Sequence, residues 1–342
     1  MAFPRITFFC ELETEALLAL VNDDLIADLS AMKAYLSLGI LDLGPERAAV
    51  VQRLNRAGVP VIAWLLLPRE QGYWFNLYNA AQAAARYADF TAWTVEYGLQ
   101  WAGIGLDIEP DLQDLTQLAR SRLRVAAIIV RRLLDWRTLR KARAVYADLV
   151  AQMHADGYHV DSYQFPVIAD ERQMGSTLLQ RAAGLVDLPG AAVDREVWML
   201  YSSFVRPHGA GIIACYAPEA QSVGLGTTMA GMDAEFGDYP PLGWGELARD
   251  LRLAWSWCED LHIYSLEGCV SQGYLERLKT FVWDAPILMP EESLTRVSAW
   301  RSALRSALWV AAHFRILMLT SMALYLTIKW GSRYLRKRWS SQ

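Results

Sequence analysis

The sequence of 342 residues predicts a (β/α)8 barrel followed by a C-terminal helix with hydrophobic and basic parts. Short apolar runs recur along the chain, and a helical stretch or a loop separates each run from the next. Eight such units fit into about 285 residues, the usual length of this fold. A doubly wound open sheet is the alternative, but no GxGxxG or GxxxxGK[ST] loop follows the first run.

The apolar runs are predicted to be parallel strands, since strands that are buried on both faces are almost continuously apolar. In chain order they are Ile6–Glu11, Tyr35–Leu41, Val61–Leu67, Gly103–Ile108, His159–Phe165, Val197–Ser202, Val223–Thr228 and His262–Leu266. The helical stretches between them include Pro45–Ala57, Asn76–Tyr97, Lys141–Ala155 and Trp244–Cys258. Gly58 and Gly157 follow two of these stretches, and glycine is typical of a helix C-terminus. The arginine-rich segment Leu112–Arg140 is predicted to elaborate the fourth helix.

The charge of the chain is divided unevenly. Residues 1–295 contain 24 Lys and Arg against 37 Asp and Glu, a net charge of −13, whereas the last 47 residues carry +9. An acidic body repels phosphate backbones, so no nucleic-acid partner is expected. The sequence therefore divides into a barrel at residues 1–285, a linker with an amphipathic helix at 286–305, and a membrane-associated helix with a basic tail at 306–342.

The segment Ser306–Ile328 is long enough to cross a bilayer, and only His313 and Arg315 interrupt it strongly. Five cations follow it. Two arrangements fit: a tail anchor that crosses the membrane, or a helix that lies in the interface with its cations on anionic headgroups. A helix packed on the barrel is disfavoured, because LMLTSMALYLTI is apolar on all sides. We expect membrane association through residues 306–338, with the barrel in the cytoplasm because the N-terminus lacks signal-peptide features.

Polar residues stand where the predicted strands end, which is where barrel enzymes place their catalytic groups. An acid at such a position can equally begin the following helix. No metal site, cofactor or GxSxG nucleophile is predicted, because the cysteines are scattered and no histidine stands at a strand end. The candidate residues at the strand ends are Glu11, Asp42, Arg69, Asp107, Glu109, Gln164, Tyr201 and Glu267.

Asp107 and Glu109 form the densest candidate site, in the run WAGIGLDIEPD. Two positions apart on a strand, their side chains point to the same face. Two carboxylates on one buried face do not both ionise easily, so one pKa should rise and provide a general acid at neutral pH. This chemistry suits cleavage of a glycosidic bond, and a carbohydrate is the expected substrate.

Aromatic side chains near the third strand provide candidate sugar platforms, because sugar rings stack on flat side chains. Tyr73 and Trp74 follow this strand in a predicted loop and are assigned, with Arg69, to substrate binding. Trp64, Trp101 and Trp198 lie in or near strands and are predicted to pack in the core.

The run AGIGLDIE resembles the fourth-strand motif of glycoside hydrolase family 18, the chitinase-like barrels, which reads D-G-x-D-x-D-x-E. WMLYSS is similar to the family's sixth-strand M-x-Y-D pattern, and YQFP resembles the end of its fifth strand. The resemblance implies that Glu109 is the proton donor and that Asp107 orients the acetamido group of the substrate. Ala102 and Gly105 replace the first two aspartates of the motif, and Ser202 replaces the last residue of the sixth-strand pattern.

Several mechanisms remain open. The resemblance implies cleavage of an N-acetylhexosamine polymer in which the acetamido oxygen is the nucleophile, assisted by Asp107 and Tyr201. In a second arrangement Glu267 is a carboxylate nucleophile, and the distance between the carboxyl groups sets retention or inversion. The alternatives outside this class are a catalytically silent barrel that binds a saccharide or a protein at the membrane, and a phosphodiesterase acting on lipid headgroups.

Overall fold

A computed structural model describes residues 4–111, 129, 131–188, 193–229 and 240–339 of the chain. Its strands form a closed parallel barrel, in which each strand pairs with the next and β8 pairs with β1. The strands are β1 (Arg5–Cys10), β2 (Tyr35–Ile40), β3 (Val61–Leu65), β4 (Gly103–Asp107), β5 (Val160–Gln164), β6 (Arg195–Met199), β7 (Ser222–Gly226) and β8 (Asp260–Tyr264). The predicted (β/α)8 barrel is confirmed, and every predicted run overlaps its strand.

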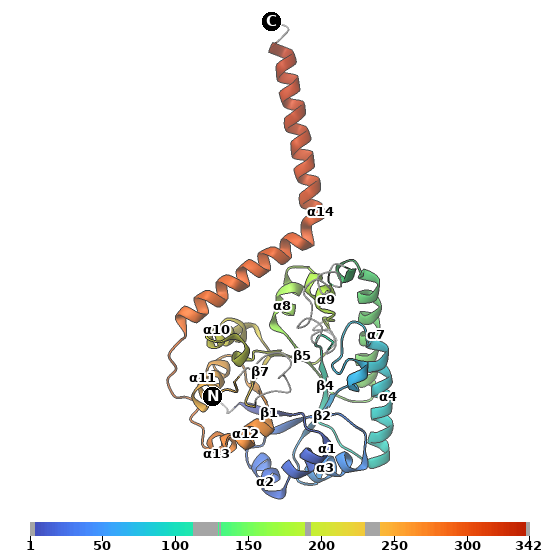
Figure 1. Cartoon of the computed structure of the whole chain (residues 1–342), viewed down its shortest axis with the longest axis vertical. Coiled ribbons are helices and arrows are strands. Elements are labelled where there is room, and N and C mark those ends of the chain that lie inside the picture. The colour runs from blue at the N-terminus through green and yellow to red at the C-terminus, as the bar shows by residue number, and fades with distance from the viewer. Residues whose placement is uncertain (1–3, 112–128, 130, 189–192, 230–239, 340–342) are drawn as a thin grey trace.

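Helices surround the barrel (Figure 1). They are α1 (Thr14–Leu20), α2 (Asp23–Ala31), α3 (Pro45–Arg56), α4 (Ala80–Tyr97), α7 (Trp136–Ala155), α8 (Pro166–Gln173), α9 (Leu178–Ala183), α10 (Gly209–Tyr216), α11 (Trp244–Trp255), α12 (Leu266–Ser271), α13 (Tyr274–Lys279) and α14 (Glu291–Trp339), with 3-10 turns at Arg69–Gln71, Ser202–Val205 and Ala217–Glu219. Gly58 and Gly157 follow α3 and α7 with φ of 73° and 88°, the left-handed conformation that glycine adopts easily at a helix end. The predicted elaboration at Leu112–Arg140 lies mostly outside the described residues, and α7 takes its last five positions.

Side chains alternate along each strand, so that one set points outward and packs on the helices and the other points into the barrel. At the N-terminal end of the barrel the inner face is closed by ion pairs. Arg195 binds Asp161 through contacts of 2.6 and 3.0 Å and reaches Asp260 at 3.0 Å, while Arg5 binds Asp260 at 2.6 Å. Charges at this end are therefore paired, and the groups available for chemistry lie at the opposite end.

Gly105 makes room for a tyrosine in the barrel interior. A Cβ atom at this position would overlap the hydroxyl group of Tyr163, which forms a hydrogen bond of 2.8 Å with Ser37 Oγ. Gly105 is the position at which the resembling motif carries its second aspartate. The Tyr163 ring, fully buried, fills the space below Asp107 in place of that side chain.

We expect Gly105→Ala to destabilise the fold by roughly 1–3 kcal/mol, the usual result of forcing extra volume into a packed interior. Gly245 in α11 is the matched control, since a Cβ atom there meets nothing within 4 Å. Urea unfolding of both variants measures the effect. A Gly105→Ala variant as stable as Gly245→Ala would show that Tyr163 can move aside.

The first part of α14 is fastened to the barrel by a buried arginine. Arg301, 7% exposed, donates to Asp170 at 2.8 Å and holds both oxygens of Glu219 at 2.7 Å, while Val297 and Leu308 are buried beside it. Within the segment predicted as a linker with an amphipathic helix, residues 286–305, the helix begins at Glu291 and docks on the barrel. Because breaking a buried ion pair costs several kcal/mol, this docking is firmly held.

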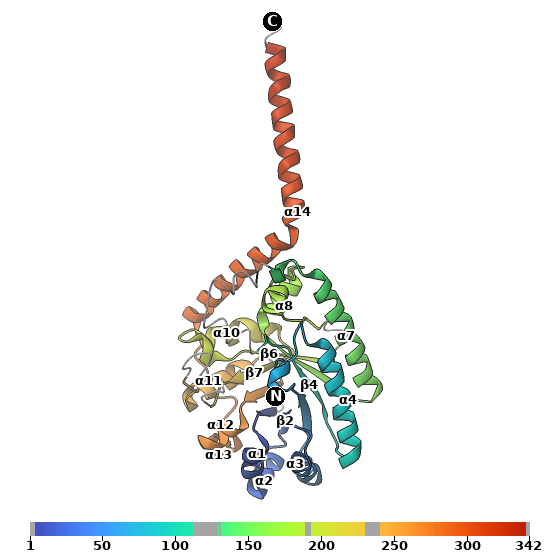
Figure 2. The same cartoon turned by 45° about the vertical axis from the view of Figure 1, so that its right-hand side comes forward.

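The second part of α14 projects away from the body (Figures 1 and 2). Its apolar side chains are exposed, among them Met318, Leu324 and Ile328. Within the described ranges, no single helix has the length and hydropathy of a membrane span; Glu291–Phe314 and Ile316–Trp330, bent by 68°, meet the requirement only as a pair.

Candidate active site

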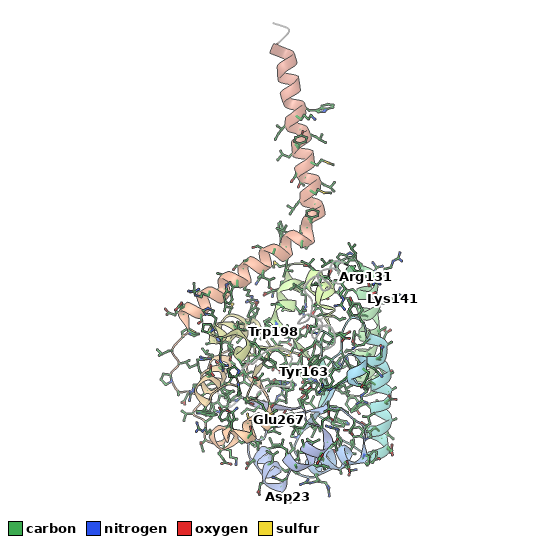
Figure 3. All side chains as sticks on the ribbon, viewed as in Figure 1. Asp23, Arg131, Lys141, Tyr163, Trp198 and Glu267 are labelled. Atoms are coloured by element: carbon green, nitrogen blue, oxygen red, sulfur yellow. The ribbon has the colours of Figure 1, made fainter. Side chains whose placement is uncertain are left out.

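Five side chains from five strands meet at the C-terminal end of the barrel. Glu11 and Tyr201 follow β1 and β6, Asp107 and Tyr264 end β4 and β8, and Trp64 is the penultimate residue of β3. Contacts or electrostatic interactions connect them. Each lies on the inward face of its strand, two residues beyond another inward residue. Tyr163 lies near the centre of the body (Figure 3).

Asp107 is the most deeply buried carboxyl group of this cluster, only 2% exposed. Burial raises its pKa well above the ordinary value, and the charges of Glu109 and Glu11 raise it further. The indole N–H of Trp64 opposes this rise in part, although neither Trp64 Nε1 nor Asp107 Oδ1 makes a hydrogen bond of normal geometry with the described residues. Asp107 Oδ1 is therefore a buried acceptor, and Trp64 Nε1 a buried donor, that lack a hydrogen-bond partner among the described residues.

Glu109 continues the inward face of β4 beyond its end. Its backbone N–H donates to Phe75 at 3.1 Å, and a bridge between Phe75 and Ile108 keeps this segment extended. The charge of Glu109 raises the pKa of both Asp107 and Tyr201, so its carboxylate lies close to both. The strand geometry predicted for the Asp107 and Glu109 pair is therefore present.

Glu11 is held by two tyrosines. Tyr73 donates to one oxygen at 2.6 Å and Tyr264 to the other at 2.7 Å. Tyr73 reaches Glu11 because Gly72 and Tyr73 both adopt positive φ, of 103° and 67°. Burial and the charge of Glu11 raise the pKa of both tyrosine hydroxyl groups, which therefore stay protonated and donate. Glu11 is thus a fixed acceptor at the rim of the site.

The loop predicted to provide sugar platforms is folded against the barrel. Tyr73 and Trp74 are 4% and 8% exposed, and their rings meet edge to face at 5.2 Å. Arg69 is exposed and lies 5.5 Å from the Tyr73 ring centre. The rings of Tyr73 and Trp74 are therefore buried rather than open to solvent, which does not favour their use as sugar platforms.

Two predicted site residues make their contacts outside this cluster. Asp42 binds Arg47 at 2.9 Å and caps Gly44, beside the start of α3; burial raises its pKa, but hydrogen bonds from Thr14 and Gly44 lower it overall. Gln164 donates to Ser162 at 2.8 Å on the outward face of β5. These contacts do not support substrate binding by either side chain, which stays a prediction.

Glu267 lies in the first turn of α12, behind the end of β1. Its Oε1 accepts the backbone N–H of Glu11 at 3.4 Å, and it interacts with Cys10, which faces the helices. Burial raises the pKa of Glu267. Its role as a second catalytic carboxylate stays a prediction, and its position beside Cys10 does not favour contact with a substrate.

Sequence reasoning overlooks two aromatic residues of the site, Tyr163 and Tyr264, for which it predicts no role. The alternation of side chains along a strand could have identified them, because counting back two residues at a time from each strand end places these residues on the inward face. Trp64 is buried at 3% exposure, as predicted, and its core cluster borders the site. Fully buried His262 is also inward, and burial, aided by the charge of Arg5, lowers its pKa to about 3, so it is neutral.

Metal ligands do not gather in the described part of the chain, where no group of three or more His, Cys, Asp or Glu residues could hold an ion. No family model matches the sequence, and no curated protein matches it.

Solved structures that are similar to the chain include barrels of different activity. A GH18 chitinase from Pseudoalteromonas aurantia has a TM-score of 0.46 at 11% identity, and the match covers 81% of this chain and 100% of that one. The PgaB (BpsB) glycoside hydrolase domain from Bordetella bronchiseptica has a TM-score of 0.49 at 13% identity, with 81% and 98% covered. A D-allulose 3-epimerase from Methylomonas sp. has a TM-score of 0.41 at 12% identity, with 88% and 100% covered. Function must therefore be argued from the site itself.

Proposed function

We propose that this protein is a glycoside hydrolase-like enzyme that cleaves a glycosidic bond at the C-terminal end of its barrel. One observation carries the proposal: Asp107 is buried beside Glu109 with a raised pKa and an unused acceptor oxygen. Because two close carboxyl groups do not both ionise easily, the pair holds one proton at neutral pH. That proton is available to a leaving oxygen.

In the proposed reaction Glu109 donates the proton that it shares with Asp107 to the glycosidic oxygen as the bond to the anomeric carbon breaks. The acetamido oxygen of the substrate attacks this carbon, and Asp107 and Tyr201 hold the acetamido group. Water then opens the cyclic intermediate and returns a proton to Glu109. Trp64 forms the apolar wall behind the sugar, with its indole N–H available as a donor.

The positions of Glu11 and Glu267 favour a reaction in which the substrate itself supplies the nucleophile. Both oxygens of Glu11 already accept hydrogen bonds from tyrosines, and Glu267 lies beside Cys10 behind β1. The substrate-assisted reaction needs neither of them to attack. This supports an N-acetylhexosamine substrate over the arrangement in which Glu267 is the nucleophile.

The experiment compares oligomers of an N-acetylated hexosamine with the same oligomers after deacetylation. We expect the purified full chain to cleave the first and leave the second intact. Equal cleavage of both would place the nucleophile on the protein. Binding without cleavage of any glycan would favour the alternative, a catalytically silent barrel that binds a saccharide.

We also propose that residues 306–338 attach the barrel to a membrane. The exposed apolar side chains of the projecting part of α14 support this attachment, and nine cations stand in the sequence after Glu292. The apolar run Ile316–Ile328 has a helical length of about 20 Å at about 1.5 Å per residue, short of the roughly 30 Å bilayer core. This length favours a helix seated in the interface over one that crosses.

Fractionation of cells that express the full chain tests the attachment. We expect the protein in the membrane fraction, with partial release by high salt because cations on headgroups are screened. A chain that resists both salt and alkali would indicate a crossing helix. A chain found wholly in the soluble fraction overturns the proposal.

A further inference from the structure

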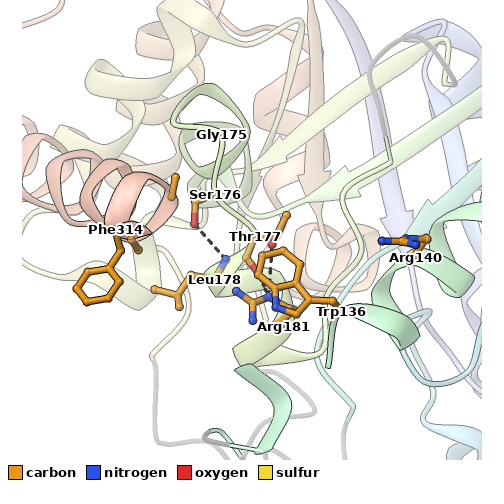
Figure 4. Close-up of a pocket in the computed structure, with 10 residues that line it drawn as sticks. Trp136, Arg140, Gly175, Ser176, Thr177, Leu178, Arg181 and Phe314 are labelled. Carbon is orange, nitrogen blue, oxygen red and sulfur yellow. Dashed lines mark hydrogen bonds between the residues drawn. The ribbon is translucent and has the colours of Figure 1, made fainter. Parts of the chain in front are cut away.

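A cleft of about 530 Å³ lies between α7, α9 and the bend of α14, away from the barrel mouth. Figure 4 shows Trp136 and Arg181 side by side in this cleft, with Phe314 on the opposite wall and Arg140 set apart from them. The loop Gly175–Leu178 forms its floor. The site proposed above uses none of these residues.

Arg181 is a buried cation: burial lowers its pKa, and the charge of Glu171 opposes this in part. It is 6% exposed, its guanidinium lies 3.7 Å from the centre of the Trp136 ring, and its Nε donates to the Thr177 carbonyl at 3.1 Å. Neither Arg181 nor Arg140 forms an ion pair with the residues that the structure describes. A planar guanidinium fixed in this way presents its terminal N–H groups in the geometry that suits a phosphate or a carboxylate.

Glu171 is the acid whose charge acts on Arg181, and its oxygens already accept hydrogen bonds from other groups. It accepts the backbone N–H groups of Leu179 at 2.6 Å and Gln180 at 3.0 Å, and the hydroxyl group of Ser176 at 3.1 Å. Glu171 therefore makes its hydrogen bonds to the start of α9 rather than to Arg181.

The cleft lies on the face of the body from which α14 projects. Phe314, which lines it, is the last residue before the bend, and the residues beyond it are apolar and exposed, as in Ile316 and Leu319. Arg131 and Lys141 are exposed at this same end of the molecule (Figure 3). The half-exposed ring of Trp136 has the amphipathic character that suits the level of lipid headgroups.

We infer that this cleft binds the phosphate of an anionic phospholipid headgroup, with Arg181 as the main ligand and Arg140 as the second cation. The inference rests on the membrane attachment proposed above. Headgroup binding would fix the angle at which the barrel stands on the membrane, because the ligand bridges α9 on the body and the bend of the membrane helix.

The test is flotation of the full chain with vesicles of phosphatidylcholine alone, or of phosphatidylcholine with phosphatidate. We expect Arg181→Lys to weaken binding to phosphatidate vesicles roughly ten-fold, because lysine keeps the charge but loses the planar fork. Arg140→Gln, at an exposed position, is expected to reduce the same binding. Arg137→Gln is the control, since Arg137 is exposed on the same helix but does not line the cleft.

The other outcomes each decide a different point. If Arg181→Lys binds like the wild type, or Arg137→Gln weakens binding as much, diffuse charge explains the binding and the cleft is not a headgroup site. Equal binding of the wild type to both vesicles overturns the headgroup site and leaves the attachment in place, whereas no binding to either overturns both. Loss of the preference for phosphatidate in millimolar glycerol phosphate would assign the cleft to a soluble phosphate ester instead.

Discussion

Replacement of Glu109 by glutamine is expected to lower the rate of glycosidic cleavage by about 10²–10⁴-fold, the usual contribution of a general acid. Glutamine keeps the shape of the side chain and its extended backbone, held through Phe75 and Ile108, but cannot release a proton. The loss should fall on kcat more than on KM, because the proton is transferred only in the transition state. Measurement of both constants with an N-acetylated oligomer checks this.

Glu267→Gln is the matched control for this experiment. Glu267 lies beside Cys10 and the backbone of Glu11, so we expect its replacement to change the rate far less than the Glu109 variant does. A comparable loss in both variants, with circular dichroism unchanged, would restore the arrangement in which Glu267 attacks. An active Glu109→Gln variant would remove Glu109 from the mechanism.

The barrel could be predicted because the same sequence pattern, an apolar strand followed by a helix or a turn, recurs along the chain. Buried parallel strands are apolar along their whole length, and turns or amphipathic helices separate them, so strands such as Gly103–Asp107 are visible one by one. The spacing of Asp107 and Glu109 likewise predicts a shared face, because alternation in a strand is local geometry.

The partners of each strand-end residue were not predictable, because they depend on contacts distant in sequence. Asp42 stands at a strand end as Asp107 does, yet it binds Arg47 and caps Gly44 at the start of the next helix. Trp64 is apolar, so its pattern alone cannot distinguish a core residue from the wall of a site. The left-handed turn at Tyr73, which brings its hydroxyl group to Glu11, has no sequence signal beyond Gly72.

Replacement of Asp107 by asparagine is expected to stabilise the fold at neutral pH while it abolishes cleavage. The pKa of Asp107 is raised in the folded protein, mainly by burial, above the value of about 3.9 for an unfolded chain. Below that value both states hold the proton and the pKa difference has no effect. As the pH rises, the unfolded chain loses its proton first, so the free energy of unfolding falls until the pH passes the folded pKa.

Asparagine cannot ionise, so the variant escapes this loss. Its advantage should grow from near zero at about pH 4 by about 1.4 kcal/mol for each pH unit, up to the folded pKa. Urea unfolding of both proteins over this range measures the slope.

Asp135 provides a control of opposite sign, because hydrogen bonds from Thr138 lower its pKa and its stabilisation is lost as the pH falls. A wild type and an Asp107→Asn variant that differ by the same free energy at every pH would mean that folding does not raise the pKa of Asp107. The proton of the Asp107 and Glu109 pair would then rest on Glu109 alone, and the raised pKa of Asp107 would no longer support the proposal.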